Sequence, residues 1–186
     1  MDLYVTLKLT ISKSWFQVLF IDSSMIKNLN GIDCKGRNHF DRNRFGTKVS
    51  MLCDHNNIPI TAVFYPANVN DAITIEDTLG SIVHNILPDK RYLHTLVGDK
   101  GYIIGHERKN KLLTMYRTNI VTPFRKNQNK INSKQHKQLL KKRIVVEHLF
   151  CSLDTFKHIR NRDDKHITQY QSMNYLAMAI LTISKM

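Results

Sequence analysis

Runs of β-forming residues and apolar residues at helical spacing follow one another along the chain. Runs rich in β-formers between polar turns are typical of strands, and apolar residues three and four positions apart are typical of amphipathic helices. The pattern predicts strands at residues 15–22, 47–54, 58–65, 91–99 and 118–124, after an alternating strand at 3–11. It predicts helices at 72–87, 106–116, about 134–156 and 167–185. Strands first, then strands alternating with helices, predict one mixed α/β domain over residues 1–186.

Three segments between the predicted strands and helices have sequences typical of a loop, a turn and a helix cap. The polar and basic stretch 27–46 contains three glycines and predicts a loop. The turn-like sequence DHNN at 54–57 joins two predicted strands and predicts a hairpin. Asp71 stands directly before the helix at 72–87, and we interpret it as the N-cap of that helix rather than as an acidic ligand.

The composition narrows the class of protein. No apolar run approaches the about 20 residues that cross a bilayer, and the N-terminus lacks the pattern of a secretory signal. The cysteines at 34, 53 and 151 form no close pair, which argues against a zinc site or a disulfide framework and favours a reducing, intracellular compartment. The net charge of +13 indicates a polyanionic partner, nucleic acid rather than membrane, although a merely solubilising surface is an alternative.

The positive charge is concentrated in one part of the sequence. From Lys111 to Val146 inclusive there are ten basic residues and no acidic one. Segment 124–143 is therefore the candidate DNA contact, through phosphates rather than bases, and the alternative is a solvated flexible loop. The candidate DNA-binding residues are Arg125, Lys126, Lys130, Lys141, Lys142 and Arg143.

Two aspartates occupy equivalent places in the pattern. Asp22 and Asp99 each come at the C-terminal end of a predicted apolar strand. In open α/β sheets, ligands bind beyond the carboxyl ends of the strands, and adjacent strands would bring both carboxylates together. The alternative is that each aspartate caps a turn.

Glu147 is the third candidate carboxylate. It shares a predicted helical stripe with Leu140, Ile144 and Cys151. A carboxylate on an apolar stripe is costly unless it is paired or binds a cation. Arg143, four residues earlier, could form an i,i+4 ion pair with it. A structural pair and a functional ligand both remain open interpretations.

Four segments together resemble a known family. They are FIDSSMIK, FGTKVSMLCDHNNIPITAVFYPANVNDA, VGDKGY and RIVVEHLF followed by FKHIRNR. In this order, over residues 16–162, they resemble the catalytic domain of DDE-type bacterial insertion-sequence transposases. The resemblance implies a ribonuclease-H-like fold, a mixed sheet flanked by helices, with Asp22 on the first strand, Asp99 after the fourth and Glu147 on a following helix.

The resemblance also implies a metal-dependent enzyme. Asp22, Asp99 and Glu147 would be catalytic and would hold two Mg²⁺ ions, with Mn²⁺ as a substitute. Mg²⁺ prefers a few carboxylate oxygens, and two such ions can serve in-line displacement at phosphorus. Arg143 matches the arginine of the family's Tyr-x-x-Arg-x-x-x-Glu-x-x-x-x-x-x-Lys signature, which implies a contact to DNA phosphate. The tyrosine and lysine positions of this signature hold Leu140 and Asp154.

The expected function is metal-dependent strand cleavage and strand transfer of an insertion sequence. The expected partners are double-stranded DNA, at transposon ends and target, and a second copy of the chain. Because few residues precede Asp22, we expect the usual N-terminal DNA-binding region to be lacking. The chain is then either truncated or needs a separately encoded partner to find transposon ends. The alternatives are a decayed or repurposed DNA-binding protein, inactive in recombination, and a plain metal-dependent nuclease. The expected location is intracellular and DNA-associated, in the cytoplasm or nucleoid, or in the nucleus of a eukaryotic host.

Overall fold

The structure, a computed structural model, describes residues 18–39, 42–83, 93–124 and 133–185. The strands are β1 (Val18–Asn28), β2 (Gly36–Asn38), β3 (Arg44–Asp54), β4 (Pro59–Pro66), β5 (His94–Val97), β6 (Thr118–Val121) and β7 (Asn161–Arg162). The helices are α2 (Thr74–Val83), α3 (His106–Tyr116), α4 (Lys134–Lys142), α5 (Ile144–Leu153), α6 (Lys157–Arg160) and α7 (Ile167–Ile183). Two 3-10 turns are η1 (Asp71–Ile73) and η2 (Lys100–Tyr102). The mixed α/β architecture predicted from the sequence is confirmed.

β1 is the central strand of one mixed sheet. It pairs antiparallel with β3 along most of its length and parallel with β5, which pairs in turn with β6. β2 and β4 pair with successive parts of β3, and β7 pairs with the end of β1. In the strand order β2-β3-β1-β5-β6, β1 therefore lies between its antiparallel neighbour β3 and its parallel neighbour β5.

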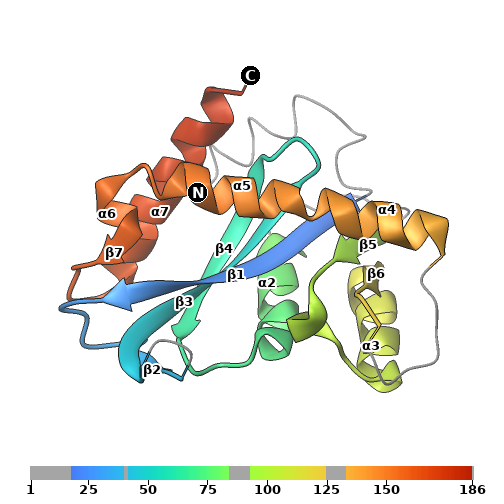
Figure 1. Cartoon of the computed structure of the whole chain (residues 1–186), viewed down its shortest axis with the longest axis horizontal. Helices are drawn as coiled ribbons and strands as arrows, with labels where there is room; N and C mark the ends of the chain where they lie inside the picture. The colour runs from blue at the N-terminus through green and yellow to red at the C-terminus, as the bar shows by residue number, and fades with distance from the viewer. Residues whose placement is uncertain (1–17, 40–41, 84–92, 125–132, 186) are drawn as a thin grey trace.

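The two faces of the sheet carry separate apolar cores. Because side chains alternate along a strand, Phe20 of β1 packs in the core under α5 and α7, whereas Leu19 and Ile21 pack in the core under α2 and α3. Figure 1 shows α4 and α5 following one another across one face, with α2 on the other side of the sheet.

Several predicted elements are confirmed. The helix at 106–116 is α3, and the strands around DHNN form the β3–β4 hairpin. The closing helix is α7, and the predicted strands at 91–99 and 118–124 contain β5 and β6. The predicted strand at 3–11 and residues 15–17 lie outside the described residues, as do residues 84–87 of the predicted helix at 72–87.

The sequence predictions for one loop, one helix and one helix cap were wrong. The stretch 27–46 is not all loop, because β1 continues to Asn28 and β2 pairs with the start of β3, where backbone hydrogen bonds outweigh the polar side chains. The helix at 134–156 is divided at Arg143, whose N–H donates to Leu140 O in a tighter i−3 bond. Asn70, not Asp71, is the N-cap of η1, the 3-10 turn that leads into α2. The Asp71 carboxylate binds Lys48 instead.

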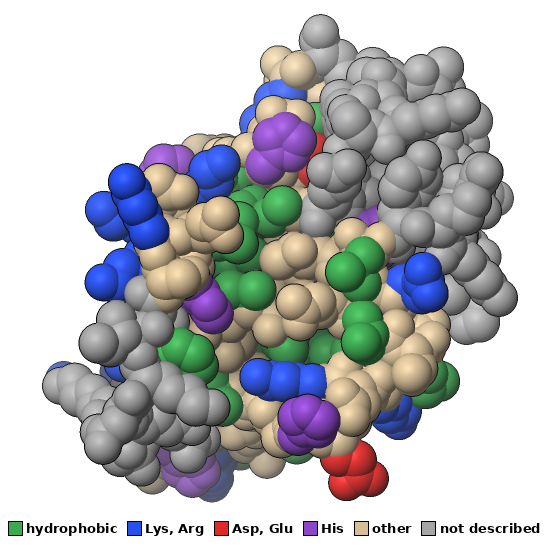
Figure 2. All heavy atoms as spheres, turned by 90° about the vertical axis from the view of Figure 1, so that its right-hand side faces the viewer, with side chains coloured by type: hydrophobic (Ala, Val, Ile, Leu, Met, Phe, Trp, Pro, Cys, Tyr) green, Lys and Arg blue, Asp and Glu red, His purple; other side chains and the backbone are tan. Residues whose placement is uncertain are grey.

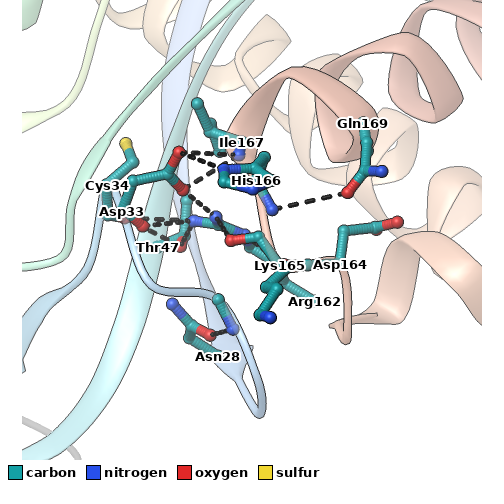
Figure 3. A network of polar contacts seen from close by, with 11 residues as sticks. Asn28, Asp33, Cys34, Thr47, Arg162, Asp164, Lys165, His166, Ile167 and Gln169 are labelled. Carbon is teal, nitrogen blue, oxygen red and sulfur yellow. Dashed lines mark hydrogen bonds and ion pairs between the residues drawn. The ribbon is translucent and has the colours of Figure 1, made fainter.

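A buried arginine connects distant parts of the sheet to α7. Arg162 is fully buried, forms an ion pair with Asp33, and donates to Asp33 O at 2.7 Å and to Thr47 Oγ1 at 3.1 Å. The Asp33 carboxylate also accepts the N–H of Ile167, the first residue of α7, at 2.9 Å. Figure 3 shows these groups around the guanidinium. The network therefore ties the segment after β1 to β3, β7 and α7.

We predict that Arg162→Met lowers the free energy of unfolding by about 2–4 kcal/mol, because the buried Thr47 Oγ1 and the half-buried backbone oxygens around the guanidinium lose their donor together. Arg160→Met is the matched control: Arg160 lies two residues away and is exposed, so its replacement should change stability by about 0.5 kcal/mol or less. Urea unfolding of both variants measures the difference. Equal losses for the two variants would contradict a structural role of the buried network.

Candidate active site

Asp22 lies in the middle of β1, not at its C-terminal end as predicted. β1 continues beyond Asp22 because residues 23–27 still pair with β3, and Lys27 and Asn28 pair with β7. The Asp22 side chain is 18% exposed, so its carboxylate stands at the edge of the core rather than free in solvent. Its Oδ1 accepts the N–H of Ser23 at 2.9 Å.

Asp99 follows β5, as predicted, and is brought beside Asp22 by strand pairing. The parallel register joins Val18 to Thr95 and Phe20 to Val97. Asp22 and Asp99 each stand two residues beyond the last of these pairs, and the charge of Asp99 raises the pKa of Asp22. Asp99 also caps η2, because its Oδ1 accepts the N–H of Gly101 at 2.7 Å. The turn-capping interpretation therefore holds for Asp99 as well.

Arg143 joins Glu147 to Asp22. Its Nη1 lies 2.7 Å from Asp22 Oδ2, and its Nη2 lies 2.6 Å from Glu147 Oε1. The i,i+4 ion pair considered from the sequence is therefore present, and the same guanidinium also reaches the central strand. Such charge-assisted bonds are the strong class of hydrogen bond.

The stripe of α5 that carries Glu147 is exposed, so it is not the buried apolar face that the sequence suggested. Its side chain is half exposed, and Ile144 on the same face of α5 is exposed too. α5 instead buries Val146, Leu149 and Leu153 against the sheet. The sequence pattern failed here because α5 is mostly apolar on all sides, so spacing alone did not identify its buried face.

The electrostatics of Asp22 reflect its crowded position. Burial is the largest influence and raises the pKa of the Asp22 carboxyl to about 6 from an ordinary 3.8. Arg143 and the Ser23 N–H oppose this increase, whereas the charges of Asp99 and Glu147 raise the pKa further. The three carboxylates therefore act on one another, and a cation beside Asp22 favours its ionised form.

Arg143 lies between Asp22 and Glu147 and separates the two carboxylates. Across the described residues, no three His, Cys, Asp or Glu side chains are close enough together to hold a metal ion. Arg143 contacts both Asp22 and Glu147.

Sequence reasoning missed the groups behind the site. Lys48 on β3 is buried and paired with Asp71, and Ser23 donates to the same carboxylate. A lysine within the apolar run at 47–54 was the available signal, because lysine is almost never buried without a partner.

The basic surface beside the site lies on α4. Lys134, Lys137, Lys141 and Lys142 are exposed, and α4 has no buried residue. His136 holds the helix to the end of β6, with Nε2 3.3 Å from Thr122 O. Figure 2 shows the side of the molecule where α3 and α4 lie, with Lys and Arg side chains around it and few acidic ones. Arg125, Lys126 and Lys130 lie outside the described residues.

None of the helices in the described ranges is long and apolar enough to cross a membrane.

Two solved structures share this fold at low sequence identity. A chain of the piggyBac transposase synaptic complex with hairpin DNA is 12% identical, with a TM-score of 0.57 over 91% of this chain. A chain of the simian T-cell lymphotropic virus intasome in complex with PP2A regulatory subunit B56 gamma is 14% identical, with a TM-score of 0.51 over 85% of this chain. The present chain spans 46% of each of those chains. These similarities support the ribonuclease-H-like fold.

No curated protein matches the chain in sequence. The family described as "Transposase DDE domain" matches residues 16–182, which is most of the chain. The match contains β1 with Asp22, the β5–η2 turn with Asp99, and α5 with Glu147. The chain therefore belongs to the transposase DDE domain family.

Proposed function

We propose that this domain cleaves DNA strands and transfers them by metal-dependent phosphoryl chemistry, as the catalytic domain of an insertion-sequence transposase. The observation that carries the proposal is the parallel pairing of β1 with β5, which brings Asp22 beside Asp99 while Arg143 joins Glu147 to Asp22. Membership of the family supports a transposase-type function. The proposed partners are double-stranded DNA at transposon ends and target, and a second copy of the chain.

The chemistry of the three carboxylates fits divalent cations. Asp22, Asp99 and Glu147 offer hard oxygen ligands, which Mg²⁺ prefers, and Mn²⁺ can replace it. The raised pKa of Asp22 reflects burial beside other acidic groups, and the guanidinium already bound there occupies a place that favours positive charge. A pair of such ions, when bound, supplies stabilisation of the attacking and leaving oxygens at phosphorus.

Arg143 has a second proposed role, as a ligand for DNA phosphate. A guanidinium binds carboxylates and phosphates with the same two-pronged geometry, so it can exchange one for the other. Its side chain is 24% exposed, which leaves it accessible to DNA. Lys141 and Lys142 directly precede it at the end of α4, and Arg125, Lys126 and Lys130 are proposed to extend this contact along the phosphate backbone.

A DNA-binding protein without recombination activity is the second candidate. Two observations favour it: Leu140 and Asp154 replace the tyrosine and lysine of the family signature, and Arg143 already neutralises two of the three carboxylates. This candidate keeps the fold and the basic surface and requires no metal.

We predict that the full chain nicks supercoiled plasmid with Mg²⁺ or Mn²⁺ and not with chelator. Asp99→Asn should lower the nicking rate by at least about a hundredfold, because the amide keeps the shape and removes a charge that would hold metal. Glu107→Gln, an equivalent change at an exposed position on α3, should leave the rate unchanged. Plasmid relaxation on agarose gels measures all three proteins.

If the wild type and Asp99→Asn both bind the plasmid and neither nicks it, the second candidate is correct. Nicking by Asp99→Asn at the wild-type rate would contradict the assignment of Asp99.

We also predict that α4 contacts the phosphate backbone. In Lys141→Gln/Lys142→Gln, the slope of log affinity against log salt should become shallower by about 2, because about 0.9 is lost for each phosphate contact. Lys109→Gln/Lys111→Gln removes the same charge from a different helix, α3, and should leave the slope nearly unchanged. Fluorescence anisotropy with a labelled duplex, from low to moderate salt, measures the slopes. Equal slopes for the two variants would show that only net charge matters.

A further inference from the structure

A buried lysine lies on the face of the sheet opposite to Asp22. Lys48 is 3% exposed, and its ammonium donates to Asp71 Oδ1 at 2.5 Å and to the carbonyl oxygen of Val69. A buried charge of this kind is stable only with a well-placed partner. Lys48 therefore fixes the position of the Asp71 carboxylate at the start of η1.

Asp71 is bonded to the strand that carries Asp22. Ser23 Oγ donates to Asp71 Oδ1 at 2.6 Å, while the Ser23 N–H donates to Asp22 Oδ1 at 2.9 Å. In the β1–β3 register, Ser23 stands opposite Ser50 and Asp22 stands opposite Met51. Because neighbouring side chains point to opposite faces, Asp71 reaches Asp22 only through the Ser23 residue between them.

Asp71 also packs against the turn that carries Asp99. A methyl group at Gly101 would lie 2.6 Å from Asp71 Oδ2 and 3.0 Å from Asp99 Oδ1. The Gly101 N–H donates to Asp99 Oδ1 at 2.7 Å. Only glycine fits here, because both carboxylates crowd the space that a Cβ of residue 101 would occupy.

We propose that Asp71, held by Lys48, is a positioning residue that sets the separation between Asp22 and Asp99 from behind the sheet. This inference rests on the proposed function, since it concerns the same carboxylates. Asp71 is not itself a ligand, because its Oδ1 binds Lys48 and Ser23 and its Oδ2 lies against Gly101. The carboxylates of Asp22 and Asp99 repel each other when both are charged. The contacts of Asp71 with Ser23 and with Gly101 hold the two segments together against this repulsion.

Binding of Mn²⁺ to the full chain without DNA tests this role, with free Mn²⁺ measured by electron paramagnetic resonance. Asp71→Asn should weaken Mn²⁺ binding about tenfold, as groups that orient metal ligands do. Ser23→Ala keeps the Lys48–Asp71 pair and removes one hydrogen bond, so it should fold and weaken binding about threefold. Asp99→Asn alters a proposed ligand and should therefore abolish Mn²⁺ binding at this site. The Mn²⁺ binding that this variant loses defines the Asp99-dependent site.

Two controls separate positioning from stability. Asp33→Asn takes the carboxylate from another buried cation, Arg162, and Ser81→Ala removes a hydroxyl bonded to Thr61 Oγ1 at 2.9 Å. Both should bind Mn²⁺ as the wild type does, even where the melting temperature falls. Wild-type affinity in Asp71→Asn and Ser23→Ala, or an equal loss in Asp33→Asn, would overturn the inference and leave the proposed function intact. A wild type that shows no Asp99-dependent binding would overturn both.

Discussion

The guanidinium of Arg143 binds Asp22 and Glu147 at the same time, and the geometry of the site depends on this double contact. Asp22 is mostly buried beside two other carboxylates, an arrangement that repulsion would otherwise open. The contact draws the start of α5 onto the central strand and coincides with the break between α4 and α5. Figure 1 shows α4 and α5 following one another across the same face of the sheet. The lysines of α4, at 134, 137, 141 and 142, are exposed.

Two cationic side chains, Lys48 and Arg143, lie on opposite faces of the sheet near the carboxylates of Asp22, Asp99 and Glu147. They differ in how deeply they are buried. Lys48 is nearly inaccessible, with 4% of its side chain exposed, and it binds the Asp71 carboxylate, which also contacts Ser23 beside Asp22 and Gly101 in the turn after Asp99. Arg143 is 24% exposed and binds the proposed ligands directly. A buried ammonium suits a permanent support, whereas an accessible guanidinium suits an exchange between carboxylate and phosphate. This difference in burial fits Lys48 to a supporting role and Arg143 to an exchangeable contact with DNA.

The sequence predicted what depends on local pattern and missed what depends on contacts. The spacing of β-formers identified β3, β4, β5 and β6, and the position of Asp99 after a strand was correct. The extent of β1 beyond Asp22 could not be predicted, because its polar second half is stabilised by pairing with β3 and β7. Asp71 was interpreted as a helix cap because its partner Lys48 lies 23 positions earlier, a distance that no local pattern covers. The ion pair of Arg143 with Glu147 was one of the interpretations that the sequence left open, whereas the bond of Arg143 to Asp22 depends on tertiary packing.

The most direct test of the central claim, that Asp22, Asp99 and Glu147 form one divalent-cation site, is an anomalous difference map from crystals grown with Mn²⁺. The account predicts a peak bonded to oxygens of Asp22 and Asp99 at about 2.1 Å, with Arg143 turned away from Asp22. The account would be contradicted by the lack of any peak at these carboxylates, with Arg143 still 2.7 Å from Asp22.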